Sequence, residues 1–151
     1  MSKKVSRRIL ALCLLATFVA ATATAPAAFG GRARKKIVPG KNFVLVAGQE
    51  ALTADGKLKI KFVSVPEDSR CPKGVNCIWA GNARVVLQVG KTAGKPSNLE
   101  LDTNPREATN AAGGGYNGYL IKLVEVAPYP VAEQPVRPRS YTVTLVVSKK
   151  N

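Results

Sequence analysis

Lys57-Leu58-Lys59-Ile60-Lys61-Phe62 is the clearest secondary-structure signal in this chain. Lysines alternate strictly with large apolar residues, so a β-strand here would place the apolar side chains on one face and the lysines on the other. The pair Asp55-Gly56 just before it is typical of a two-residue hairpin turn. The sequence therefore predicts a half-buried antiparallel strand, paired with a segment that ends near Thr53.

Further strands are predicted at residues 43–47, 83–89, 98–102, 119–126 and 141–147. No segment beyond the N-terminal region sustains a helical period of apolar residues, and most prolines and glycines fall between the strands. We therefore expect an all-β, single-domain antiparallel β-sandwich or a partly open barrel. Two long loops are expected, at 103–118, where Gly113-Gly114-Gly115 predicts mobility, and at the proline-rich residues 128–139.

The N-terminus has the three parts of a secretory signal. Residues 1–8 contain four basic residues and no acid, residues 9–21 are apolar, and residues 22–28 are small. This pattern predicts a signal peptide over residues 1–23, with Ala28 as a later cleavage position. Ser6-Arg7-Arg8 also resembles a twin-arginine signal. On either route the protein is expected to be exported, to the periplasm or the extracellular space.

Cleavage would leave a strongly basic chain. The signal contains four of the 23 basic residues and none of the nine acids, so the remainder has a net charge of 19 − 9, or +10. About 125 residues remain, enough for one domain with a core. We expect a basic flexible arm over residues 24–41 and the sandwich over 42–151. Arg32, Arg34, Lys35 and Lys36 in the arm suit either a solvated spacer or contact with an anionic surface.

Two cysteines survive the predicted cleavage, because Cys13 lies inside the signal. An even count in an oxidising compartment predicts a disulfide between Cys71 and Cys77. Closing this short ring would stabilise the fold by about 2.4 kcal/mol in the chain-entropy model. Trp79 is expected to pack near the disulfide as a core aromatic. A redox pair or a zinc site fits poorly, because the spacing is not Cys-x-x-Cys and the chain has no histidine.

The same loop is a candidate interaction site. Arg70, Lys73 and Trp79 would stand on a rigid turn, which loses little entropy when it binds a partner. One version is a secreted protease inhibitor that offers Arg70 or Lys73 to a trypsin-like pocket.

A resemblance supports export without adding an activity. Asp68-Ser69-Arg70-Cys71-Pro72 followed by Cys77-Ile78-Trp79-Ala80-Gly81, with a late strand pair at residues 124–130 and 141–147, resembles a group of small exported bacterial proteins of uncharacterised function. The resemblance implies a secreted single-domain protein and assigns no functional residues.

The missing residue types narrow the function classes. Without histidine, Ser-His and Cys-His mechanisms and histidine-ligated metals are excluded within one chain. Glu100 and Asp102 are expected to face solvent from one strand, and no complete calcium loop is present. We therefore expect no catalytic residue, no cofactor and no metal.

The expected role is a non-catalytic binding or structural module at the cell envelope. Its expected partners are anionic envelope components or another exported protein, with peripheral membrane contact. Export and the few aromatic residues disfavour nucleic acid.

Overall fold

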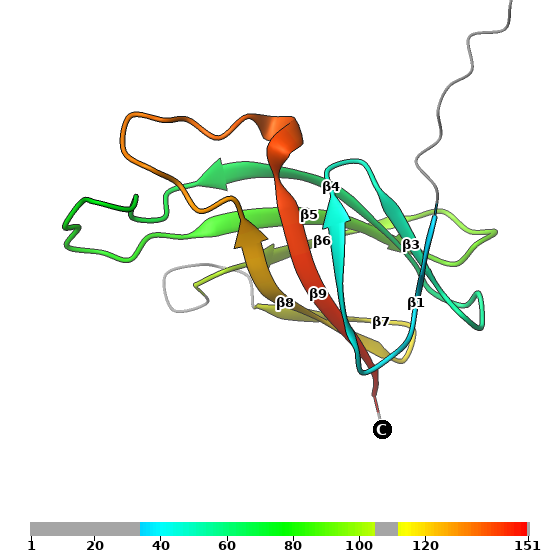
Figure 1. The fold of residues 1–151 in the computed structure, drawn as a ribbon. Coiled ribbons are helices and arrows are strands. Elements are labelled where there is room, and N and C mark those ends of the chain that lie inside the picture. The colour runs from blue at the N-terminus through cyan, green and yellow to red at the C-terminus, as the bar shows by residue number, and fades with distance from the viewer. Residues whose placement is uncertain (1–33, 105–111, 151) are drawn as a thin grey trace, which may run out of the picture. The chain divides into compact units, whose positions relative to one another are not determined.

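The computed structural model describes residues 34–104 and 112–150, and these residues form two β-sheets and one short 3-10 helix (Figure 1). The predicted signal peptide and residues 24–33 of the predicted arm, Arg32 included, lie outside the described residues.

One sheet has five strands. In spatial order they are β1 (Lys35–Ile37), β3 (Glu50–Thr53), β4 (Lys59–Asp68), β5 (Ala83–Gly90) and β6 (Ser97–Asp102). β1 runs parallel to β3, and the other pairs are antiparallel. β4 and β5 are the long central strands, and the loop that joins them contains both cysteines of the domain.

The other sheet has four antiparallel strands. In spatial order they are β2 (Asn42–Val46), β9 (Thr142–Lys149), β8 (Tyr119–Ala127) and β7 (Gly113–Tyr116), and the 3-10 helix η1 (Pro138–Ser140) lies just before β9. This sheet lies across the five-stranded one, and the two do not close into a barrel (Figure 1). The fold is a β-sandwich, as the sequence predicts.

The core lies between the sheets and follows the predicted alternation. Leu58, Ile60 and Phe62 are fully buried, whereas Lys59 and Lys61 lie on the outer face of β4. The largest side chains that meet them are Leu45, Val85, Leu87, Leu101, Ile121, Val143, Leu145 and Val147. The regular pairing of β4 with β5 breaks after Phe62 and again before Glu67. Pro66 lies in the second break, where its missing N–H is tolerated.

The hairpin before β4 exists, but its turn is longer than predicted. The Thr53 N–H donates to the Leu58 carbonyl at 3.0 Å, so four residues, 54–57, form the loop. Asp55 accepts from the Thr53 hydroxyl at 2.6 Å and from the Lys57 N–H at 3.1 Å. These carboxylate bonds favour the wider turn over the two-residue one. Gly56 supplies the positive φ of 68° that the turn requires.

The predicted flexible arm is partly structured. Residues 35–37 form β1 beside β3, and Ile37 is buried in the core. Two apolar residues, Ile37 and Val38, between basic and turn residues give too weak a pattern to predict a strand, yet Ile37 fills the sheet edge. The sandwich therefore begins before residue 42.

The glycines predicted to be mobile form the edge strand β7 instead. Gly114 faces Leu99 of β6, and a Cβ at Gly114 would collide with the Leu99 side chain. Glycine is used here because the edges of the two sheets approach closely, which a residue with a side chain would prevent.

Candidate functional site

Residues 69–82, which we call the cysteine loop, form a hairpin between β4 and β5. The Ser69 N–H donates to the Asn82 carbonyl at 2.7 Å, and the Cys71 N–H donates to the Ala80 carbonyl at 3.0 Å. Gly81 has a φ of 70°, and a Cβ there would collide with the Ser69 carbonyl. The base of the loop is therefore closed by backbone contacts that only glycine permits.

Cys71 and Cys77 lie at disulfide distance, with their Sγ atoms 2.17 Å and their Cα atoms 5.9 Å apart. This agrees with the predicted pairing. Cys71 lies beside the base of the hairpin, whereas Cys77 lies on its exposed part. The bond thus links the tip to the base.

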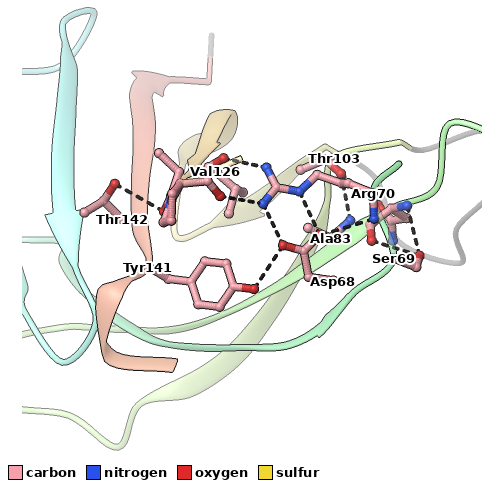
Figure 2. A network of polar contacts seen from close by, with 11 residues as sticks. Asp68, Ser69, Arg70, Ala83, Thr103, Val126, Tyr141 and Thr142 are labelled. Carbon is pink, nitrogen blue, oxygen red and sulfur yellow. Dashed lines mark hydrogen bonds and ion pairs between the residues drawn. The ribbon is translucent and has the colours of Figure 1, made fainter. Parts of the chain in front are cut away.

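Arg70 is buried, which contradicts its prediction as an exposed interaction residue. Only 7% of the residue is exposed. Its Nε and Nη2 donate to the two carboxylate oxygens of Asp68 at 2.8 and 2.6 Å, while Nη1 and Nη2 donate to the carbonyls of Val126 and Pro128 at 2.6 and 3.0 Å (Figure 2). The guanidinium also lies 4.9 Å from the centre of the Tyr129 ring. Arg70 therefore joins the cysteine loop to the end of β8.

Asp68 is the centre of this network. In addition to Arg70 it accepts a hydrogen bond from the Tyr141 hydroxyl at 3.0 Å (Figure 2). Burial raises the pKa of the Asp68 carboxyl, but the hydrogen bonds and charge of Arg70 outweigh it, so that the pKa is lowered. Burial, with the Asp68 contact, raises the pKa of Tyr141 to about 12. Both carboxylate oxygens are occupied, so the network supports structure rather than chemistry.

Trp79 is exposed, which contradicts its prediction as a core aromatic. It is 74% exposed, and the neighbouring Ile78 is 92% exposed. Val75, across the loop, is 46% exposed. An extended backbone after Cys77 would place Trp79 beside the disulfide, but the chain bends at Ile78 and Trp79 before β5 begins. The tip of the loop is thus an apolar surface in water.

Lys73 lies where the cysteine loop meets the segment between β8 and β9. Its N–H donates to the Pro130 carbonyl at 3.0 Å, and its Nζ lies 5.8 Å from the centre of the Tyr129 ring. Its side chain is exposed and forms no ion pair among the described residues. A groove of about 590 Å³ lies beside this contact, with Pro72 and Val131 in its lining.

A second polar network supports the base of the cysteine loop. The Asn82 side chain donates to Asp102 at 2.7 Å and accepts from the Thr103 hydroxyl at 3.1 Å. Asp102 is fully buried, which contradicts the predicted solvent-facing position, whereas Glu100 is exposed as expected. Within residues 34–104 and 112–150 no group of three or more acids or cysteines is arranged to hold a metal ion.

The described basic residues of the predicted arm differ in their surroundings. Arg34 forms an ion pair with Glu50 at 3.3 Å. The Lys35 ammonium donates to the Val44 carbonyl at 3.3 Å. Lys36 is exposed. The arm is therefore less available as a free cationic segment than the sequence predicts.

A larger cluster of cations lies at the end of the sandwich that contains the β3–β4 turn. Six exposed lysines, which we call the lysine end, lie in or beside the turns there: Lys41, Lys57, Lys91, Lys95, Lys149 and Lys150. Lys41 belongs to this group because the preceding Gly40 N–H donates to the Val147 carbonyl near the end of β9, at 2.7 Å.

Direct contacts hold the turns of the lysine end together. The Thr92 hydroxyl donates to the Gly56 carbonyl at 2.7 Å, which joins the β5–β6 turn to the β3–β4 turn. The Tyr119 hydroxyl donates to Asp55 at 2.7 Å, and Tyr119 lies opposite Lys149 in the sheet. These lysines are far apart in the sequence, and only the strand pairing shows that their turns share one end.

The acidic residue at this end is committed to the fold. Asp55 is the one acid in the described turns there. Hydrogen bonds from Thr53, Tyr119 and the Lys57 N–H lower the pKa of its carboxyl, and the contact with Asp55 raises the pKa of Tyr119. The carboxylate stays ionised while its oxygens are occupied, so it offers little competition for an anion approaching the lysines.

No helix in the described ranges is long and apolar enough to cross a bilayer. No family model, no curated protein and no solved structure matches this chain.

Proposed function

We propose that this protein is an exported, non-catalytic binding module of the cell envelope that attaches to polyanions through its lysine end. The N-terminal sequence pattern supports export, and the net charge of 19 − 9, or +10, that remains after the predicted cleavage supports an anionic partner.

The proposal is carried by a difference between basic and acidic side chains: the lysines of this end are exposed, whereas four acids are engaged in contacts within the fold. The six lysines of the lysine end point to solvent. In contrast, Asp55 and Asp68 are engaged in internal hydrogen bonds, and Glu50 and Glu67 pair with arginines. The field outside this end is therefore positive, and a polyanion would gain about 1 kcal/mol for each lysine it contacts at low salt.

Two variants of equal charge test this placement. The first replaces Lys57, Lys91, Lys95 and Lys149 by glutamine. The control replaces Lys35, Lys36, Lys61 and Lys122, which lie within strands β1, β4 and β8 rather than in the turns of that end. Both lose four positive charges, so overall charge cannot explain a difference between them.

The measurement is calorimetric binding of soluble polyphosphate over a series of salt concentrations. We expect salt-sensitive binding by the unmodified protein, a loss of at least tenfold and a flatter salt dependence in the first variant, and a smaller loss in the control. Absent or salt-independent binding by the unmodified protein would reject the function. Equal losses in the two variants would reject the lysine end as its site.

The alternative, a secreted protease inhibitor using the Cys71–Cys77 loop, has less support. Arg70 is buried and fully engaged, which removes one of the two residues that such an inhibitor would offer. The Lys73 N–H is bonded to the Pro130 carbonyl. A protease would need this backbone free to pair with its own cleft. Inhibition of a trypsin-like enzyme that disappears in Lys73→Ala would restore this alternative.

A further inference from the structure

We propose that the cysteine loop is a second binding site, which inserts Ile78 and Trp79 into the headgroup region of an anionic lipid bilayer. This inference goes beyond polyanion binding at the lysine end and does not depend on it.

The apolar tip of the loop is the first observation. Ile78 is 92% exposed and Trp79 is 74% exposed, in contrast to the inward-facing apolar side chains of β4 and β5, which are buried. Val75, in the same loop, is a third exposed apolar side chain, at 46%. Indole rings favour the boundary between lipid headgroups and acyl chains, because one edge is polar and the rest is apolar.

The size of the tip favours lipid over a protein partner. A stable protein interface takes about 800 Å² from each side, and a large aromatic residue supplies about 150–250 Å². Three side chains on a short hairpin fall well below that area. A lipid surface surrounds a protruding tip on all sides and needs no matching pocket, so a few apolar side chains suffice.

The loop is held in place before any contact is made. Arg70 ties its base to the end of β8, Cys71 and Cys77 tie the base to the tip, and the Lys73 N–H ties one side to Pro130. The backbone on either side of Ile78 and Trp79 is therefore anchored, at Cys77 by the disulfide and at Ala80 by the hydrogen bond from the Cys71 N–H. A fixed loop also loses little conformational entropy on insertion.

The charges around the tip complement anionic headgroups. Residues 69–82 contain no acid, and of their two cations Arg70 is paired with Asp68, whereas Lys73 is exposed and forms no ion pair with any residue that the structure describes. The neighbouring segment, residues 128–141, contains Arg137 and Arg139 against one acid, Glu133. The cysteine loop leaves the five-stranded sheet and residues 128–141 leave the four-stranded one, and both lie at the same end of the sandwich (Figure 1). Basic residues beside an apolar tip strengthen attachment to anionic lipid.

The cysteine loop and the lysine end lie at opposite ends of β4. Ten residues of strand separate them, or about 33 Å at 3.3 Å per residue. One flat bilayer cannot contact both. A molecule inserted through the cysteine loop would present its lysine end away from the membrane, toward other polyanions of the envelope.

Trp79 is the only tryptophan of the chain and reports directly on the site. Its fluorescence is to be measured with vesicles of phosphatidylcholine alone, with vesicles containing phosphatidylglycerol, and with brominated lipid as quencher. We expect a blue shift and quenching with phosphatidylglycerol vesicles and little change with phosphatidylcholine alone. Unchanged emission on vesicles that nevertheless sediment the protein would overturn the inference, as would equal shifts on the two lipids.

Matched variants distinguish insertion of the cysteine loop from nonspecific hydrophobic adsorption to the vesicles. Ile78→Ser is expected to weaken vesicle binding about tenfold, because it removes one inserted apolar side chain. Val124→Ser is the control, since Val124 is 53% exposed on β8, away from the tip. It should change binding less than twofold. Equal losses in Ile78→Ser and Val124→Ser would contradict insertion of the loop.

The lysine-end variant distinguishes this inference from the proposed function. If the inference is correct, that variant keeps the Trp79 shift even where its polyphosphate binding is lost. Loss of the shift in that variant, with Ile78→Ser unaffected, would assign membrane contact to the lysine end and overturn the inference. Far-ultraviolet circular dichroism of each variant verifies that the sandwich is folded.

Discussion

The Tyr119 hydroxyl donates a hydrogen bond to Asp55 at 2.7 Å, from the first residue of β8 to the β3–β4 turn of the opposite sheet. A second tyrosine and aspartate, Tyr141 and Asp68, make the same contact at the far end of β4, at 3.0 Å. Each end of β4 is thus tied to the four-stranded sheet by a phenol and a carboxylate. These bonds fix how the sheets lie across each other, which positions both the lysine end and the cysteine loop.

Removing the Tyr119 hydroxyl should weaken the contact between the two sheets at the β3–β4 turn. Tyr119→Phe leaves the ring in place and removes the donor to Asp55, and we expect it to lower the free energy of unfolding by about 1 kcal/mol. Tyr129→Phe is the control, because Tyr129 is partly exposed on a loop. Urea unfolding followed by circular dichroism measures both, and a control that loses as much as Tyr119→Phe would contradict the role of the bond.

Stability should fall at alkaline pH through Tyr141. Its pKa is raised to about 12 in the folded protein, so its contribution is complete below the ordinary tyrosine pKa of about 10 and is lost as the pH rises toward 12. Tyr141→Phe should therefore reduce the loss of stability between pH 10 and 12. Urea midpoints of the two proteins over this range give the comparison, and parallel curves would contradict the assignment.

Acid should act through the carboxylates. The pKa values of Asp55 and Asp68 are lowered in the folded protein, so their contribution is present above about pH 4 and is lost as the pH falls below it. Asp68→Asn should lower the free energy of unfolding at pH 7 and make that free energy depend less on pH in the acidic range. If the unfolding free energy of the variant fell as steeply with acid as that of the unmodified protein, groups other than Asp68 would account for the acid sensitivity.

Arg70 should be the most sensitive residue of the cysteine loop. Its removal leaves Asp68 buried without its charge partner, which typically costs about 3–5 kcal/mol. We expect Arg70→Ala to destabilise the domain by this amount, and Arg70→Lys to recover only part, because an ammonium cannot make the forked contacts. Lys73→Ala, at an exposed position of the same loop, should change stability by less than about 0.5 kcal/mol. Thermal unfolding distinguishes these outcomes.

Gly81 and Gly94 provide a matched pair. Gly81 has a positive φ and no room for a Cβ beside Ser69, whereas Gly94 has only ordinary contacts around it. Gly81→Ala should cost more than about 2 kcal/mol, since an unfavourable backbone conformation is combined with a collision. Gly94→Ala should be neutral or slightly stabilising. Similar denaturation midpoints for the two variants would contradict this account of the loop base.

The strand pattern of this protein is local information, which is why it can be read from the sequence. The alternation around Leu58, Ile60 and Phe62 predicts a strand with one buried face, and the spacing of Cys71 and Cys77 predicts their pairing. Both depend on residues that are close together in the chain. The long β-strands, the buried residues of β4 and β9, and the sandwich class follow from this kind of pattern alone.

Contacts between residues far apart in the sequence determine the features that local patterns do not predict. Arg70 is buried because the end of β8, more than fifty residues away, offers it two carbonyls, and Trp79 is exposed because no strand passes over it. β1 and β7 form because sheet edges accept a single buried Ile37 and a bare Gly114. The lysine end exists because separate turns meet at one end. Periodicity records which face of a strand is buried, but not which strands meet, and that depends on packing of the whole chain.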